Sequence, residues 1–320
     1  MAGPSRSSDP GAPKLPGPHA VVALDVGGTA IKSGVVNPDQ GAVLDRRTTT
    51  FNSNGPAAEV LGVLANAVRL HEGLVGSLSK TSVGLAFPSP FDYERGTCLI
   101  EPGPQGKFTH LYGVDVRREL SERIETPIEA ISFINDAQAA VLGEARFGAG
   151  VGFKRLIGLT LGTGLGSCFV AEGAVALGKR GVPKGEGMLY SEPYKDGIAD
   201  DAFSIRGLIG RFPKRDTALD VKTAARLARE HDFELGKAFR DFGRDLGRFL
   251  KPYSGKFKAD GVVVMGGLAN CFDLFGAAME AELDRSCRRG ALQGSDAAFL
   301  SVAGLFHEVT PPAGPDLGRR

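Results

Sequence analysis

The stretch Ala20-Val-Val-Ala-Leu-Asp-Val-Gly-Gly-Thr-Ala-Ile-Lys32 decides the fold, because its pattern occurs a second time later in the chain. An apolar, β-branched run ends in a Gly-Gly-Thr turn, and a second apolar run follows at once, which is typical of two strands joined as a hairpin. The second copy runs from Arg155 to Leu161, turns at Gly162-Thr-Gly-Leu-Gly-Ser167 and continues as the apolar run Cys168 to Ala171. A unit that occurs once in each half of the chain indicates an internal duplication.

Strands and helices alternate around these two units. Further strands are expected at 45–51, 81–87, 127–134 and 261–265, and helices at 57–70, 111–124, 137–147, 221–230 and 235–250. The alternation predicts an α/β architecture. We expect disordered tails at 1–18 and 310–320, where Gly and Pro are frequent, and two domains at 19–150 and 151–309, with a hinge near 148–153.

The charge balance argues against some classes of partner. The 320 residues include 38 Lys and Arg and 37 Asp and Glu, a net charge of +1, so nothing electrostatic favours nucleic acid or an anionic membrane. The four cysteines form no C-x-x-C pair, which favours free thiols in a reducing compartment. Because a membrane-spanning apolar run and a signal-peptide core are both missing, the sequence predicts a cytoplasmic protein that binds a small molecule.

The first turn has the composition of a phosphate-binding loop. Gly27 and Gly28 free the backbone N–H groups to point at an anion, and Thr29 adds a hydroxyl donor. Asp25, at the end of the preceding strand, is placed to hold a hydrated Mg²⁺ that bridges phosphates. A plain hairpin with a Gly-Gly turn is the structural alternative.

The second turn repeats this chemistry with Gly162, Thr163 and Gly164. It does not match a dinucleotide fingerprint, because Ser167 stands at the sixth position and a strand-like run follows. The Gly-Lys-Ser/Thr of a P-loop is missing from both turns. Two such turns predict two hairpins that hold a polyphosphate from opposite sides.

Three further candidates carry polar or glycine signals. Asn135-Asp136 comes between a strand and an Ala-rich helix, where it would cap the helix or orient a hydroxyl and accept its proton during phosphoryl transfer. Gly266-Gly267 follows a buried strand and would admit a flat ring or ribose, or simply turn the chain. Glu186 and Asp200 belong to an acidic, Gly-rich stretch that would bind clustered hydroxyls or form a solvated loop.

Four motifs together resemble the ROK family of sugar kinases, which belongs to the actin-like ATPase superfamily. Asp25 to Lys32 resembles the family's first phosphate motif, and Phe133 to Ala140 with Gly143-Glu144 resembles its catalytic motif. Leu159 to Gly166 resembles the second phosphate motif, and Val263-Val-Met-Gly-Gly-Leu268 the adenosine motif. The resemblance extends from Val21 to about Phe306.

The resemblance implies two actin-like (ribonuclease H-like) domains with ATP and Mg²⁺ in the cleft between them, and a hexose such as glucose as the acceptor. It implies Asp136 as the catalytic base. It also implies sugar ligands at Asn135, Asp136, Glu186 and Asp200, phosphate contacts at Gly27, Gly28, Thr29, Lys32, Gly162, Thr163 and Gly164, and adenosine contacts at Gly266 and Gly267. A homodimer is compatible with the family.

The chain departs from the family pattern in its acceptor region. Leu189 stands where many members have a zinc-binding His, and the zinc cysteines are missing, so we expect no structural zinc. The Asn that commonly contacts the sugar is missing around Lys107-Phe108. The substrate pocket is therefore expected to be non-standard.

Two alternatives remain beside an ATP-dependent kinase. One is a non-catalytic sugar or nucleotide sensor on the same fold. The other is a kinase that uses polyphosphate, for which a basic groove would come from Lys32, Lys179, Arg180 and Lys184. A regulator with an added DNA-binding domain is not expected, because the segment before the first strand is short and not a basic helix.

Overall fold

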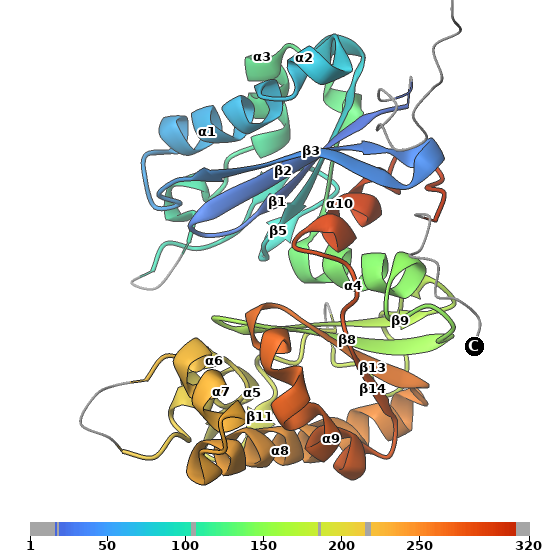
Figure 1. The fold of residues 1–320 in the computed structure, drawn as a ribbon. Helices are drawn as coiled ribbons and strands as arrows, with labels where there is room; N and C mark the ends of the chain where they lie inside the picture. The colour runs from blue at the N-terminus through green and yellow to red at the C-terminus, as the bar shows by residue number, and fades with distance from the viewer. Residues whose placement is uncertain (1–16, 18, 104–106, 185–186, 215–218, 312–320) are drawn as a thin grey trace, which may run out of the picture.

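The computed structural model describes residues 17, 19–103, 107–184, 187–214 and 219–311. Two five-stranded sheets form its frame (Figure 1). The first has the order β3-β2-β1-β4-β7, with β1 (Val21–Val26), β2 (Ala30–Asn37), β3 (Ala42–Thr50), β4 (Ser82–Phe87) and β7 (Ile131–Asn135). The second has the order β10-β9-β8-β13-β14, with β8 (Arg155–Leu161), β9 (Leu165–Ala171), β10 (Ala174–Val175), β13 (Gly261–Met265) and β14 (Ser286–Arg289). Two short pairs lie outside these sheets, β5 (Phe91–Asp92) with β6 (Thr97–Cys98) and β11 (Pro193–Tyr194) with β12 (Gly197–Ile198).

The two sheets share one topology. In the first, β1 pairs antiparallel with β2 and parallel with β4, and β4 pairs parallel with β7. In the second, β8 pairs antiparallel with β9 and parallel with β13, and β13 pairs parallel with β14. The repeated strand–turn–strand unit therefore opens each sheet, and the predicted α/β class is confirmed.

Helices form layers around and between the sheets (Figure 1). One outer layer, on the first sheet, contains α1 (Ala57–Arg69), α2 (Glu72–Val75) and α3 (Val116–Ile124). The other, beyond the second sheet, contains α5 (Ala199–Ala202), α6 (Ile205–Ile209), α7 (Val221–Arg229), α8 (Phe233–Phe257) and α9 (Phe272–Leu283). Between the two sheets lie α4 (Asp136–Phe147) and α10 (Asp296–Ala303).

Strand β1 shows how the sequence builds these layers. Successive side chains of a strand point to opposite faces of the sheet. Val22 and Leu24 pack into the core beneath α1 and α3, whereas Val21 and Ala23 pack against α10. Because both faces of β1 are covered by helices, its side chains are apolar nearly without interruption, as is usual for a strand buried on both faces.

Helix α10 follows the second sheet in the chain but packs on the first. Phe299 and Val302 are buried with Val21 of β1. The sequence did not indicate this helix, because its eight residues are apolar on nearly every side and show no amphipathic period. The domain limits at 19–150 and 151–309 remain a prediction. Helix α10 belongs to the second range by sequence, but it packs on the sheet of the first.

The two element starts that differ most from their predictions do so for local reasons. The strand expected at 127–134 begins only at Ile131, because Ile128–Ala130 forms a 3₁₀ turn. The helix expected at 111–124 begins at Val116, where the carboxylate of Asp115 accepts a hydrogen bond from Arg118 N at 3.0 Å. In the described part of the chain, no helix is both long and apolar enough to cross a membrane.

Candidate active site

Two cavities lie in the cleft between the sheets and share Asp136, Ala137, Thr160 and Gly266. The larger, about 980 Å³, is the donor-side cavity, lined by residues that include Asp25, Lys32, Glu144, Met265, Gly267, Asn270, Arg289, Gln293 and Ser295. The smaller, about 540 Å³, is the acceptor-side cavity, lined by residues that include Ser89, Lys107, Asn135, Gly162, Thr163, Gly164, Met188, Tyr190 and Asp200. The two cavities therefore meet at these four residues, of which Asp136 is the one with an ionisable side chain.

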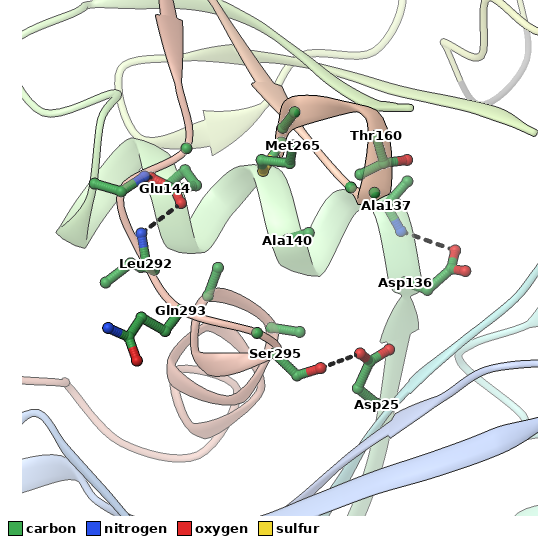
Figure 2. Close-up of a pocket in the computed structure, with 18 of the residues that line it drawn as sticks. Asp25, Asp136, Ala137, Ala140, Glu144, Thr160, Met265, Leu292, Gln293 and Ser295 are labelled. Atoms are coloured by element: carbon green, nitrogen blue, oxygen red, sulfur yellow. Dashed lines mark hydrogen bonds between the residues drawn. The ribbon is translucent and has the colours of Figure 1, made fainter. Parts of the chain in front are cut away.

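Asp136 is held at the junction of β7 and α4. The residue before it, Asn135, caps α4, since its side chain accepts a hydrogen bond from Gln138 N at 3.0 Å. Asp136 is the first residue of the helix, and its Oδ1 accepts a hydrogen bond from Ala137 N at 2.8 Å (Figure 2). Asn135 therefore supplies the cap, and Asp136 lines both cavities of the cleft.

The surroundings of Asp136 make its carboxylate a stronger base. Burial is the main cause that raises the pKa of Asp136, and the negative charge of Asp25 raises it further. The N–H of Ala137 and the positive charge of Lys107 act in the opposite direction. A carboxyl group with a raised pKa in a cleft is a candidate for proton transfer.

Asp25, near the end of β1, lines the donor-side cavity together with Asp136 (Figure 2). Ser295, just before α10, donates a hydrogen bond from its hydroxyl to Oδ2 of Asp25. Lys32 Nζ lies 4.0 Å from the same oxygen. The end of β1 is thus tied to the last helix, and one carboxylate oxygen is fixed in direction.

The two predicted phosphate turns face the cleft differently. Gly162, Thr163 and Gly164 line the acceptor-side cavity. Gly27, Gly28 and Thr29 are not part of either lining. They follow Asp25 directly, and Gly28 is in contact with Lys107, which does line the acceptor-side cavity.

The predicted sugar ligands meet at the acceptor-side cavity in part. Asn135 lines it and donates a hydrogen bond from Nδ2 to Tyr93 Oη at 3.1 Å. Asp200 also lines it, but both of its oxygens are used within the protein, by Leu165 N at 2.6 Å and by Arg206 Nη2 at 2.5 Å. Glu186 lies outside the described residues. The sugar-binding role of these residues remains a prediction.

Gly266 and Gly267 are part of the donor-side cavity, as expected for an adenosine site. Gly266 has φ 83°, and a Cβ there would lie 2.5 Å from the carbonyl oxygen of Leu161, so only glycine fits. Beside them, Arg289 Nη2 donates to Asn270 Oδ1 at 2.8 Å. The backbone of Gly266 and Gly267 therefore forms part of the cavity wall, and no side chain projects from it there.

Three residues of the cleft were not identified as functional from the sequence: Glu144, Lys107 and Ser295. Glu144 carried a signal, since it ends the Gly143-Glu144 pair of the catalytic motif. Lys107 lies where the expected Asn is missing. Ser295 comes near Asp25 only through the return of the last helix, which no local pattern indicates.

Comparison with known proteins extends over most of the chain. The model of the ROK family matches residues 21–296. The glucokinase of Thermotoga maritima is 27% identical over 82% of this chain and 87% of its own length. The glucokinase of Streptomyces coelicolor is 30% identical over 55% of this chain and 51% of its own length.

Solved structures are similar over nearly the whole described fold. The ROK hexokinase of Thermus thermophilus is 25% identical, with a TM-score of 0.65 over 89% of this chain and 97% of its own. A ROK family glucokinase from Streptomyces griseus, solved in complex with glucose and AMPPNP, is 22% identical, with a TM-score of 0.68 over 90% of this chain and 99% of its own. The predicted fold class, two actin-like domains with a cleft between them, is confirmed by this similarity. With the family model matching residues 21–296, the chain belongs to the ROK family.

Proposed function

We propose that this protein is a sugar kinase that transfers the terminal phosphoryl group of ATP to a hydroxyl of a hexose, with glucose as the first acceptor to test. The observation that carries the proposal is the position of Asp136, where the donor-side and acceptor-side cavities meet. The family and the glucokinase relatives support the same reaction class.

Each cavity suits one substrate. The donor-side cavity is lined by Gly266 and Gly267, where backbone can approach a ring or ribose closely, and by Asp25 and Lys32, which suit phosphates and their counter-ion. The acceptor-side cavity contains polar groups from several elements, such as Asn135 and Tyr190, around a volume of about 540 Å³. A hexose bound there places a hydroxyl beside Asp136.

The reaction follows from this arrangement. The acceptor oxygen forms a new bond to the γ-phosphorus, and the bond from that phosphorus to the β,γ-bridging oxygen breaks, with its electron pair leaving on ADP. The hydroxyl proton passes to the carboxylate of Asp136. Sequestering the cleft from water favours transfer to the sugar over hydrolysis.

The donor set around Asp25 fits Mg²⁺ bound through water. Mg²⁺ commonly keeps several waters and uses one or two carboxylates together with substrate phosphates. The hydrogen bond from Ser295 fixes the carboxylate of Asp25 toward the donor-side cavity, which Asp136 also lines. When bound, the ion would supply charge neutralisation at the phosphates.

The test is an ADP-release assay with a panel of hexoses, amino sugars and polyols, on the wild type and on Asp136→Asn. We expect one sugar to give turnover that falls by about 10²–10⁴-fold in Asp136→Asn, while sugar binding measured by calorimetry remains. Asp284→Asn, at a side chain 92% exposed, is the matched control. If no sugar stimulates ADP release, ATP is not the donor and the proposal fails in that part. If none is phosphorylated with polyphosphate either, the kinase proposal fails as a whole.

A further inference from the structure

Lys107 lines the acceptor-side cavity, and its neighbour Phe108 fixes the backbone there. Phe108 is completely buried, and its ring lies 5.0 Å from the ring of Phe87, at the end of β4. Phe108 has φ 58°, a left-handed conformation that costs a non-glycine residue about 1 kcal/mol or more. The burial of Phe108 fixes the backbone there, while Lys107 itself lines the cleft.

The hydrocarbon chain of Lys107 lies across the first phosphate turn. A Cβ added to Gly28 would come within 2.5 Å of Lys107 Cδ and 2.8 Å of Cε. Any side chain at position 28 would therefore displace the lysine. The glycine allows the lysine chain to pass over the turn toward the cleft.

The charge of Lys107 has no partner in the part of the chain that the structure describes. Among the described residues, none forms an ion pair or a hydrogen bond with its ammonium group. Other cations that line the cavities differ, since Lys32 Nζ lies 4.0 Å from Asp25 Oδ2 and Arg289 donates a hydrogen bond to Asn270. The positive charge of Lys107 acts on Asp136: it lowers the pKa of that carboxyl, whereas burial raises it. Within those residues, a cation near the proposed base is thus left free for a ligand.

We propose that Lys107 contacts the phosphoryl group while it is being transferred to the acceptor hydroxyl, and that it stabilises the charge of this group in the transition state. The contact would lie between the first phosphate turn and the acceptor. This inference rests on the proposed kinase function. Negative charge in phosphoryl transfer is spread over the oxygens of the transferred group, and a positioned cation stabilises it most when water is excluded. The contact of Lys107 with Gly28, a residue of the phosphate turn, favours this role over binding of an anion on the acceptor.

The test compares Lys107→Met, which keeps the chain length but removes the charge, with Lys107→Arg and with the matched control Lys80→Met. Lys80 is exposed and lies in the turn Leu78–Lys80, away from both cavities. We expect Lys107→Met to lower kcat by about 10²–10³-fold with little change in the KM of either substrate. Lys107→Arg should retain part of the activity, and Lys80→Met all of it. The affinity for ADP with aluminium fluoride and sugar, a mimic of the transition state, should fall in Lys107→Met far more than the affinity for ADP alone.

The outcomes separate this inference from the proposed function. A wild type that is active while Lys107→Met keeps its kcat overturns the role of Lys107 alone. A loss confined to the KM of the acceptor, or to acceptors with an anionic group, also overturns it and assigns the lysine to acceptor binding. A wild type inactive on every sugar overturns the kinase proposal, and the role of Lys107 with it.

Discussion

Glu144 and Leu292, 148 residues apart in the chain, are joined by a hydrogen bond of 2.9 Å from Leu292 N to Glu144 Oε1 (Figure 2). The other carboxylate oxygen, Oε2, accepts hydrogen bonds from Ala149 N at 2.7 Å and from Ala291 N at 3.1 Å. Ala149 lies in the segment that connects α4 to β8 of the second sheet. Residues 290–295 connect β14 of that sheet to α10, which packs on the first sheet. The buried carboxylate of Glu144 therefore binds to both segments that connect the two sheets.

Replacing this carboxylate should weaken the whole fold. Glu144→Gln keeps the size but puts an NH₂ group where one of the oxygens accepts, so a buried N–H loses its partner. We expect the free energy of unfolding in urea to fall by about 2–3 kcal/mol. Glu122→Gln, at a side chain 62% exposed in a helical ion pair, should change it by no more than about 0.5 kcal/mol. Equal effects of the two substitutions would show that Glu144 does not hold the two connecting segments.

The close packing of α4 on α10 gives a second prediction. A Cβ on Gly143 would lie 2.0 Å from the carbonyl oxygen of Ala297, a backbone atom that no rotamer change can move away. Gly143→Ala should therefore lower the free energy of unfolding by about 1–3 kcal/mol, despite the better helix propensity of alanine. Gly62→Ala in α1, where a Cβ would meet nothing within 4 Å, should instead stabilise by about 0.5–1 kcal/mol. Two substitutions with the same sign would contradict this account of the helix contact.

The sequence was sufficient for those parts of the fold and the site that depend on local pattern. The hairpins were evident because strand, glycine turn and strand follow one another without interruption, and Arg155–Leu161 was predicted to the residue. Asn135 and Asp136 were expected where a strand passes into a helix, and they lie at the end of β7 and the start of α4.

What the sequence could not reveal depends on contacts between distant segments. The hydrogen bond of Ser295 to Asp25 spans 270 residues, and it exists only because α10 returns to the first sheet. The position of Lys107 on Gly28 likewise depends on how a loop folds back over the turn. Neither leaves a periodic or compositional signal, so both needed the structure.

A buried histidine gives the protein a predictable loss of stability in mild acid. His71 is fully buried, with Nδ1 2.9 Å from Asp45 Oδ2 and Nε2 2.8 Å from Ser33 Oγ. Burial lowers the pKa of His71, against the opposing effect of Asp45. Below about pH 6.5 the unfolded chain therefore binds a proton that the folded protein does not, and stability falls as the pH falls, by up to about 1.4 kcal/mol per pH unit. The lowered pKa of Asp45, which accepts hydrogen bonds from Arg47 and His71, adds a loss of the same sign at lower pH.

Urea unfolding at pH 7.5 and pH 5.5 checks this prediction in the wild type, His71→Gln and His19→Gln. The wild type and the His19→Gln control, at an exposed side chain, should lose stability between the two conditions. His71→Gln should lose about 1 kcal/mol less, because its side chain does not titrate. If all three proteins show the same dependence on pH, the buried histidine is not the cause.

The acceptor-side cavity gives a prediction that separates two roles of Asp200. One carboxylate oxygen of Asp200 accepts a hydrogen bond from Leu165 N, which directly follows the turn Gly162–Gly164. The other accepts one from the guanidinium of Arg206. If Asp200 positions the second phosphate turn, Asp200→Asn and Arg206→Gln should both raise the KM for ATP and lower kcat, because each loosens the same contact. A fall in kcat/KM of about 10-fold corresponds to the loss of one hydrogen bond of about 1.4 kcal/mol.

Direct binding of the sugar by Asp200 would produce a different pattern in the same steady-state measurements. Asp200→Asn would then raise the KM for the sugar, while Arg206→Gln, which leaves the carboxylate in place and frees one of its oxygens, would not. Asp201→Asn is the matched control, since Asp201 also pairs with Arg206 but is 59% exposed and does not line the cavity. We expect the two substitutions to act alike on ATP, because each weakens the contacts that hold Asp200 between Leu165 N and Arg206. A change in the KM of the sugar confined to Asp200→Asn would instead establish the residue as a sugar ligand, as the family resemblance implied.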